Sequence, residues 1–320
     1  MEVAPGIHRI TAPLGDRFVC LYLLTGDESA LLVDTGIDET PRAYLLPYLD
    51  QIGLEPGSIR YVLNSHADYD HTAGNGAMRE LAPSACFLCH ALDLAMVEEM
   101  ERIIRERYDE LGPEHGFYES ESAKAAMRAT SRTTPIDIAL QGGESIRLGS
   151  SWRVEVWHTP GHSRGHVTVY DPRSRSLIIC DAALYHAVLR GDGSPAFPPT
   201  YRYVDTYEAT LQRLQATQAE WLLTSHYPVY DRMGAQEFLA ESRAFVARVD
   251  RALEAALAAA QGPRTLRQLV EELGPQLGAW PEAANPALSQ PLIGHLERWL
   301  AAGRVRQERQ AGLPAYVLAR

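Results

Sequence analysis

Four side chains of the kinds that bind metal ions fall within six residues of the segment 64–74, NSHADYDHTAG. They are His66, Asp68, Asp70 and His71. Imidazole and carboxylate groups together suit zinc, iron or manganese. On an extended strand end, side chains two residues apart point to the same side, so the first three can reach a common point. His71 follows on the turn into a predicted helix. This clustering predicts a metal site, whereas a polar loop would show no such spacing.

Three further candidates lie downstream, each where a predicted buried strand ends and a loop begins. They are His162, Asp181 and His226, which follow the apolar runs 154–157, 177–180 and 221–224. His162 sits in a glycine-containing turn, TPGHSRGH, that would expose its ring. In layered α/β folds, sites are built at such strand ends. The seven residues are therefore expected to meet at one edge of a sheet.

The elements that must position these residues alternate between strands and helices. The run 59–64 reads as a buried strand that delivers the first cluster at its C-terminal end, and residues 74–81 read as the helix after it. Residues 167–170 and 177–180 resemble a hairpin, and 236–260 a long helix. This alternation predicts an α/β fold whose sheet is covered on both faces.

Residues from about 91 to 135 break the alternation. The pattern predicts one long amphipathic helix over 91–110 and a second over 120–129. We interpret them as a helical insertion within a domain spanning 1–261. The insertion could cover an active site. It could equally form an exterior surface, including that of a homodimer, and the sequence leaves these alternatives open.

The dipeptide Gly262-Pro263 separates a second region, 262–320. Helical patterns over 265–273 and 288–302 precede two short strands around Gln310-Ala311-Gly312. Helices followed by a two-stranded wing suggest a winged-helix-like domain. Its seven arginines and five glutamates make it only mildly basic, which disfavours nucleic acid as a partner.

The composition of the 320 residues is that of a globular protein, with 46% hydrophobic and 22% charged residues and a net charge of −11. This charge disfavours a chain-wide nucleic-acid or membrane role. The sequence shows no signal-peptide pattern and no apolar run of membrane length. Four scattered cysteines fit a reduced cytoplasm. We expect a cytoplasmic protein with a small-molecule substrate.

The order of these motifs resembles the metallo-β-lactamase fold superfamily. Asp34 in LVDTG matches the family's early structural aspartate, residues 66–71 match its first ligand motif, and His162, Asp181 and His226 match its later ligands. The resemblance covers roughly residues 1–250, and the C-terminal region is similar to a winged-helix module found in some members. It implies a four-layer αββα sandwich with a dinuclear metal site between the sheets.

The resemblance also implies a role for each ligand. One ion would take His66, residue 68 and His162, and the other Asp70, His71 and His226, with Asp181 bridging both. Two such ions can share a hydroxide that attacks a substrate, because coordination lowers the pKa of water to about 7. Asp70 would orient this nucleophile and could shuttle a proton.

Position 68 departs from the family pattern, which usually has histidine there, so that the first motif becomes HxDxDH. A third carboxylate adds negative charge and favours harder metals. We expect two divalent transition-metal ions, zinc first, with iron or manganese as alternatives that Asp68 favours. Asp68 could instead fail to bind, leaving a single-metal site.

Three other residues are weaker candidates for binding substrate: His166, Tyr185 and Tyr227. His166 follows His162 by four residues and suits a hydrogen-bonding role beside the ligands. Tyr185 follows Asp181 by four residues, and lactonases of the superfamily use a nearby tyrosine at a different spacing. Tyr227 adjoins His226.

Three functions are compatible with this site. The first is a metal-dependent hydrolase that uses a metal-bridging hydroxide on an ester, thioester or lactone of a small molecule. The second is an RNA-cleaving nuclease that uses the winged helix. The third is an iron-dependent oxidoreductase or dioxygenase, which Asp68 favours and the lack of a flavin module disfavours in its diiron form.

Overall fold

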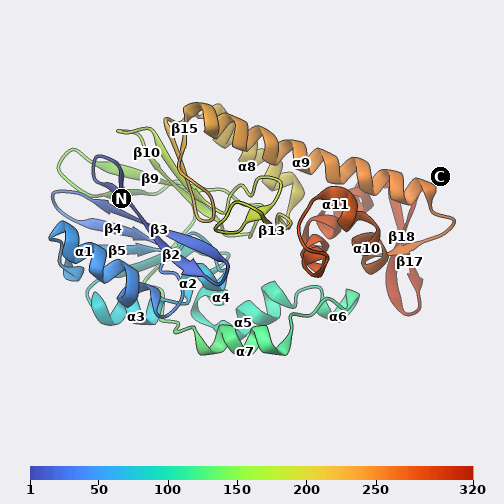
Figure 1. Ribbon diagram of the computed structural model, residues 1–320, viewed down its shortest axis with the longest axis horizontal. Helices are drawn as coiled ribbons and strands as arrows, with labels where there is room; N and C mark the ends of the chain where they lie inside the picture. Colours follow the sequence, from blue (N-terminus) through green and yellow to red (C-terminus); the bar gives the residue numbers. More distant parts are fainter. Residues whose placement is uncertain (320) are drawn as a thin grey trace.

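The computed structural model describes residues 1–319 and shows two β-sheets stacked face to face, with helices on both outer sides (Figure 1). The first sheet has the strand order β1-β2-β3-β4-β5-β6-β7. Strands β1 to β4 pair antiparallel, and β4 to β7 pair parallel. The strands are β1 (Glu2–Ala4), β2 (Ile7–Leu14), β3 (Arg17–Thr25), β4 (Ala30–Val33), β5 (Ile59–Leu63), β6 (Cys86–His90) and β7 (Ile138–Leu140).

The second sheet has the order β15-β14-β11-β10-β9-β8. Only β11 and β14 pair parallel, and β10 and β11 form the predicted hairpin. Its strands are β8 (Ser145–Arg147), β9 (Arg153–His158), β10 (Val167–Asp171), β11 (Ser176–Cys180), β14 (Trp221–Thr224) and β15 (Tyr230–Asp231). A separate pair, β12 (Val188–Leu189) and β13 (Pro195–Phe197), lies in the loop that follows β11.

Three apolar layers hold the sandwich together. The middle layer joins side chains of both sheets, such as Leu24 and Val33 with Val156 and Ile178. Helices η1 (Pro41–Leu45), α1 (Leu46–Ile52) and α3 (Asn75–Leu81) cover the outer face of the first sheet. Helices α8 (Val204–Ala216) and α9 (Arg232–Ala259) cover that of the second. This arrangement confirms the predicted α/β sandwich.

The insertion differs from its prediction, because the helix expected over 91–110 is broken. Helix α4 (Leu94–Glu98) ends at Glu99, whose backbone is extended, and α5 (Met100–Ile103) runs into the π-helical turn η3 (Ile104–Tyr108). The break lets the two halves bury different faces. Val97 packs against β6, whereas Ile103 at the end of α5 and Ile104 at the start of η3 are buried further along the insertion. The short helix α6 (Gly112–His115) and helix α7 (Glu121–Ala129) complete the insertion.

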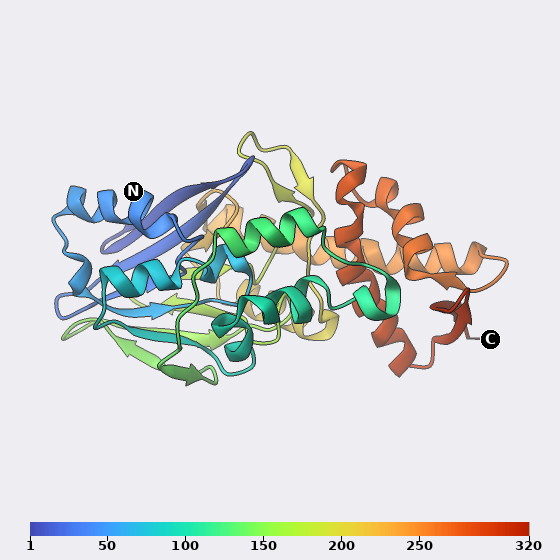
Figure 2. The same cartoon turned by 90° about the horizontal axis from the view of Figure 1, so that it is seen from below.

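Seen from below, the insertion runs from the sheets towards the C-terminal region (Figure 2). That region contains β16 (Arg264–Thr265), α10 (Leu266–Leu277), η4 (Glu282–Leu288), α11 (Ser289–Ala301), β17 (Val305–Gln310) and β18 (Leu313–Leu318). Its helices share one hydrophobic cluster with α8 and α9, so its core continues that of the sandwich. The helices and wing match the predicted pattern, but a winged-helix domain remains a prediction. Within residues 1–319, no helix is both long and apolar enough to cross a membrane.

Hydrogen bonds to one carboxylate link α11 to α9. Asp250 of α9 accepts hydrogen bonds from His295 Nδ1 at 2.9 Å, Arg298 Nη2 at 2.6 Å and Trp299 Nε1 at 3.0 Å. Burial opposes ionisation, but the hydrogen bonds from His295 and Arg298 outweigh it and lower the pKa of Asp250 to about 2. The ionised carboxylate is therefore favoured in the folded state.

We expect Asp250→Asn to lower the free energy of unfolding by about 1 kcal/mol at neutral pH, a value reduced for the partial exposure of the carboxylate. A lowered folded-state pKa stabilises the protein above the unfolded pKa of about 4, and this stabilisation is lost as the pH falls towards 2. Denaturant unfolding between pH 3 and 7 measures the difference from wild type. Glu254→Gln, on the same helix but in an exposed pair with Arg304, is the control and should change stability little. A pH-independent difference would contradict the assignment.

Candidate metal centre

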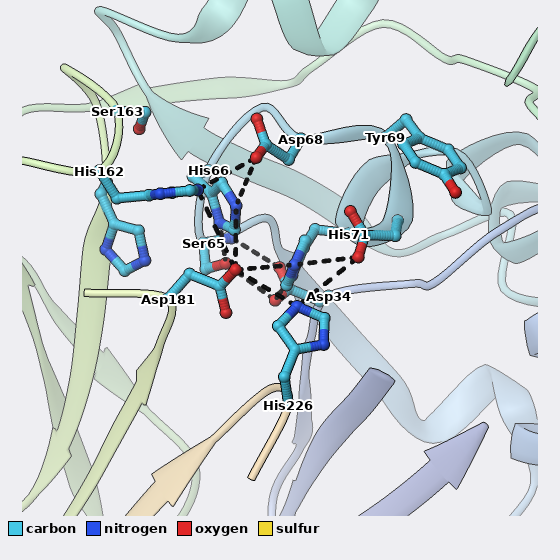
Figure 3. Close-up of polar contacts among 12 residues, drawn as sticks. Asp34, Ser65, His66, Asp68, Tyr69, His71, His162, Ser163, Asp181 and His226 are labelled. Carbon is cyan, nitrogen blue, oxygen red and sulfur yellow. Dashed lines mark hydrogen bonds and ion pairs between the residues drawn. The ribbon is translucent and has the colours of Figure 1, made fainter. Parts of the chain in front are cut away.

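Loops at the ends of four strands bring the predicted ligands together (Figure 3). Residues 64–68 leave β5 and lead into the short helix α2 (Tyr69–Thr72), which carries Asp70 and His71. His162, Asp181 and His226 follow β9, β11 and β14 of the other sheet. All seven side chains thus meet where the two sheets open at one edge.

The donor atoms fall into three sets, each within 4.8 Å. One set, His66, His71 and Asp181, links the other two, which are the two predicted ligand groups. In the first, Asp68 Oδ2 lies 3.7 Å from His66 Nε2 and 3.0 Å from His162 Nε2. In the second, Asp70 Oδ2 lies 3.8 Å from His71 Nε2 and 3.6 Å from His226 Nε2.

Asp181 lies between the two groups (Figure 3). Its Oδ2 is 4.0 Å from the Nε2 atoms of His66 and His162, 3.7 Å from that of His71 and 3.3 Å from that of His226. A carboxylate at this position can serve both groups, as the family resemblance implied.

Buried atoms without partners show that these residues fit cations. His66 Nε2, His71 Nε2 and Asp181 Oδ1 are buried and have no hydrogen-bond partner among residues 1–319. Such atoms are costly to bury unless something pairs with them. Bonds of about 2.1 Å to a tetrahedral ion place donor atoms about 3.4 Å apart, and the histidine–carboxylate separations given above range from 3.0 to 4.0 Å. The donor set therefore fits two divalent ions.

The other ring nitrogens are held by hydrogen bonds that turn Nε2 towards the centre. His226 Nδ1 donates to the carbonyl oxygen of Phe18 at 2.8 Å, and His71 Nδ1 donates to Asp34 at 2.8 Å. Ser65 Oγ donates to Asp34, so it accepts from His66 Nδ1 at 2.9 Å. Such partners fix the tautomer and orientation of metal-binding histidines.

Asp34 organises this layer from the end of β4. It is fully buried with a left-handed backbone (φ 63°), and it also accepts the backbone N–H of Ser65 at 2.7 Å. Burial raises its pKa, but the charge of His71 and the hydrogen bonds outweigh that effect and hold the pKa below its ordinary value. The early aspartate predicted to be structural thus contacts both ends of the first ligand segment, at Ser65 and at His71.

The electrostatics around His71 and His226 favour positive charge, since the pKa of each imidazole is raised, despite burial, by neighbouring carboxylates. Burial lowers the pKa of His71, but the neighbouring carboxylates Asp70, Asp34 and Asp181 outweigh it and raise the pKa well above its usual range. Burial also disfavours the ionised form of Asp181, whereas His226 and His71 hold its pKa well below the ordinary value. A field that favours a proton on these imidazoles equally favours a metal cation.

Asp68 contacts a residue that sequence reasoning missed. Arg107, from η3 of the insertion, donates from Nε to Asp68 Oδ1 at 2.7 Å and from Nη2 to Asp68 Oδ2 at 3.1 Å. Burial disfavours the carboxylate, but the charges of Arg107 and His162 hold its pKa well below the ordinary value. Arg107 is one of several arginines on a charged helical pattern, and no local spacing distinguishes it.

The weaker candidates occupy other positions. The His166 ring stacks on that of His66, with centroids 5.0 Å apart, and its Nδ1 bonds to Thr159 Oγ1 at 3.0 Å. Tyr185 stacks on Phe238, and Tyr227 is buried with its hydroxyl donating to the carbonyl oxygens of Leu184 and Ala187. None of the three lines the cavity described next.

A cavity of about 410 Å³ opens over the donor atoms. The insertion contributes its aromatic wall through Tyr108, Phe117 and Tyr118, and Phe197 of β13 adds to it. The C-terminal region closes another side with residues 286–290. The donors it reaches are Asp68, Asp70, His162, Asp181 and His226. A small molecule in this cavity would contact both groups of donors.

Comparison with known proteins gives matches that agree with this geometry. The family model of the metallo-beta-lactamase superfamily matches residues 14–226. A hydroxyacylglutathione hydrolase of Pseudomonas aeruginosa is 28% identical over 127 residues, covering 35% of this chain and 48% of that protein. An N-acyl homoserine lactonase of Bacillus thuringiensis is 25% identical over 191 residues, covering 52% of this chain and 64% of that protein. The chain thus spans about half to two thirds of these relatives.

Two solved structures share the fold over nearly the whole chain. A metallo-beta-lactamase family protein from Thermus thermophilus has a TM-score of 0.74 at 24% identity and covers 99% of this chain and 100% of its own. A beta-lactamase domain protein from Burkholderia ambifaria has a TM-score of 0.77 at 19% identity, with 100% and 93% covered. At these identities the likeness concerns the fold. With its sandwich, its converging donors and a family match over two thirds of its length, this chain belongs to the metallo-beta-lactamase superfamily.

Proposed function

We propose that the protein is a dinuclear metal-dependent hydrolase that cleaves an ester, thioester or lactone of a small molecule. The observation that carries this proposal is the set of seven donors, five of which line an open cavity, with Asp181 between the two groups. Zinc is the expected metal, because imidazole nitrogens and carboxylate oxygens at tetrahedral separations suit it.

Two cations bound here would supply a water nucleophile at neutral pH and polarise the carbonyl under attack. The protein's own residues would do the rest. Asp70 is buried except at the cavity, and its Oδ2 stays within 3.6 to 3.8 Å of His226 and His71. From this position its carboxylate can orient the attacking water and hold the proton that is released.

The walls of the cavity support a small acyl substrate. Aromatic side chains would pack against an apolar acyl group, while the metal-binding donors would face the bond to be cleaved. The names of the relatives describe hydrolysis of an acylglutathione and of a lactone, both acyl compounds. A panel of esters, thioesters, lactones and β-lactams, tested with the metal-loaded protein, would identify the class. Absence of hydrolysis across the panel would refute the proposal.

We expect about two zinc ions per chain after loading, because two donor groups share Asp181. Elemental analysis of dialysed protein measures this ratio. Removing the ions with a chelator should abolish hydrolysis and lower the melting temperature, since four imidazoles and three carboxylates lose their counter-charge. Adding zinc back should restore both. Protein that retains no metal and shows no thermal shift with any added ion would contradict the site.

We expect Asp70→Asn to reduce kcat by about 10²- to 10⁴-fold, the usual contribution of a positioned acid or base, with a smaller change in KM. The amide keeps the shape of the side chain but cannot hold a proton. Steady-state kinetics on the best substrate, with metal content measured in parallel, provides the test. Asp50→Asn, an exposed change on α1, should behave as wild type. An Asp70→Asn variant with full kcat and full metal content would remove Asp70 from the reaction.

A further inference from the structure

A buried arginine of the insertion is joined to the ligand position that departs from the family pattern. The Arg107 guanidinium donates two hydrogen bonds to the Asp68 carboxylate, from Nε to Oδ1 at 2.7 Å and from Nη2 to Oδ2 at 3.1 Å. Arg107 is only 7% exposed. Two parallel bonds between a guanidinium and a carboxylate fix both orientation and charge.

The same guanidinium also contacts the His162 segment. Nη1 donates to the carbonyl oxygen of His162 at 3.2 Å, and Nη2 lies 3.0 Å from its Nε2 and 3.3 Å from its Nδ1. An atom nearly equidistant from both ring nitrogens cannot lie along the lone pair of Nε2, which points away from Nδ1. Arg107 Nη2 therefore lies off that lone pair and leaves it free.

A second contact ties the insertion to the same motif. The backbone N–H of Tyr69 donates to the Tyr108 hydroxyl at 3.1 Å. Consecutive residues of η3 thus hold consecutive residues of the first ligand segment. The position of Asp68 depends on a part of the chain that lies 39 residues away.

The charges of the pair explain why an aspartate can stand where the family usually has histidine. Asp68, Asp70 and Asp181 bring three negative charges to the centre, and Arg107 cancels one of them. The remaining charge equals that of a site with a neutral imidazole at position 68. Arg107, which is not itself a metal ligand, neutralises the added charge of Asp68. The cation held by Asp68 therefore need not be harder than zinc.

We propose that Arg107 is a positioning residue of the metal centre, which holds Asp68 and the His162 segment in the geometry of the first cation and cancels the extra charge of Asp68. The proposal rests on the metal site proposed above and is independent of the substrate. It assigns to the insertion a role in building the centre as well as in lining the cavity.

Zinc titration against a chromophoric chelator tests this proposal without any substrate. In Arg107→Met we expect the more weakly held zinc ion to bind at least tenfold more weakly than in wild type, while the ion at Asp70, His71 and His226 keeps its affinity. Arg105→Met, on the same turn but exposed and paired with the adjacent Glu106, is the matched control and should bind both ions as wild type does.

The reciprocal variants separate positioning from a general effect on folding. Asp68→His alone would leave Arg107 as an unpaired buried cation beside an ion, so we expect it too to lose at least tenfold in affinity for one ion. The double variant Asp68→His/Arg107→Met should recover both ions to within about threefold of wild type. Circular dichroism monitors the folding of each variant. If Arg107→Met alone fails to fold, the comparison of Asp68→His with the double variant still decides the question.

Three outcomes would overturn the proposal. Arg107→Met could bind both ions with wild-type affinity, or more tightly, which would make Arg107 a competitor of the first cation. Asp68→His alone could bind both ions normally. The double variant could remain as weak as Asp68→His. A protein that binds metal as expected but hydrolyses no substrate would refute the proposed function and leave the role of Arg107 intact.

Discussion

Three carboxylates and four imidazoles meet at one edge of this molecule, with several donor atoms closer than 4 Å. Carboxylates that share one buried centre repel one another, and buried donors without partners destabilise the fold. Positive charge at the centre removes both penalties at once. Much of the surrounding structure is arranged around this requirement. Asp34 holds His71, and through Ser65 also His66, in the tautomer that binds a cation. Arg107 supplies a fixed positive charge to the one ligand position that the family pattern does not explain.

The sandwich supplies rigidity where the donors need it. Asp181 and His226 lie within two residues of the ends of the buried strands β11 and β14, and the segment that carries His66 leaves the end of β5. Such strands cannot slide by one residue without turning their apolar side chains to the wrong face. The donors therefore keep their separations even though they come from two sheets and from loops far apart in the sequence.

The walls of the cavity come from parts of the chain outside the sandwich. The insertion contributes aromatic residues and Arg107, and residues 286–290 of the C-terminal region face them across the cavity. Arg267 of the C-terminal region also donates to the carbonyl oxygen of Gly116 in the insertion at 2.9 Å, which joins the two walls. Most donors thus come from the sandwich, whereas the cavity walls come from the insertion and the C-terminal region, and such outer segments commonly vary when one fold serves many reactions.

The sequence alone predicted an α/β fold and the seven residues that converge, because strand–helix alternation and the placing of polar residues at strand ends are encoded locally, whereas the stacking of two sheets into a sandwich was implied by the family resemblance. Alternating apolar runs predict strands, and polar residues at their ends predict a site at one edge. Tertiary structure decided what local patterns cannot contain. The break at Glu99 arises because the two halves of the insertion bury different faces, and Tyr185 and Tyr227 turn to pack beside Phe238 instead of lining the cavity. The partnership of Asp68 with Arg107 joins residues whose spacing follows no helical or strand period, so only the folded chain brings them together.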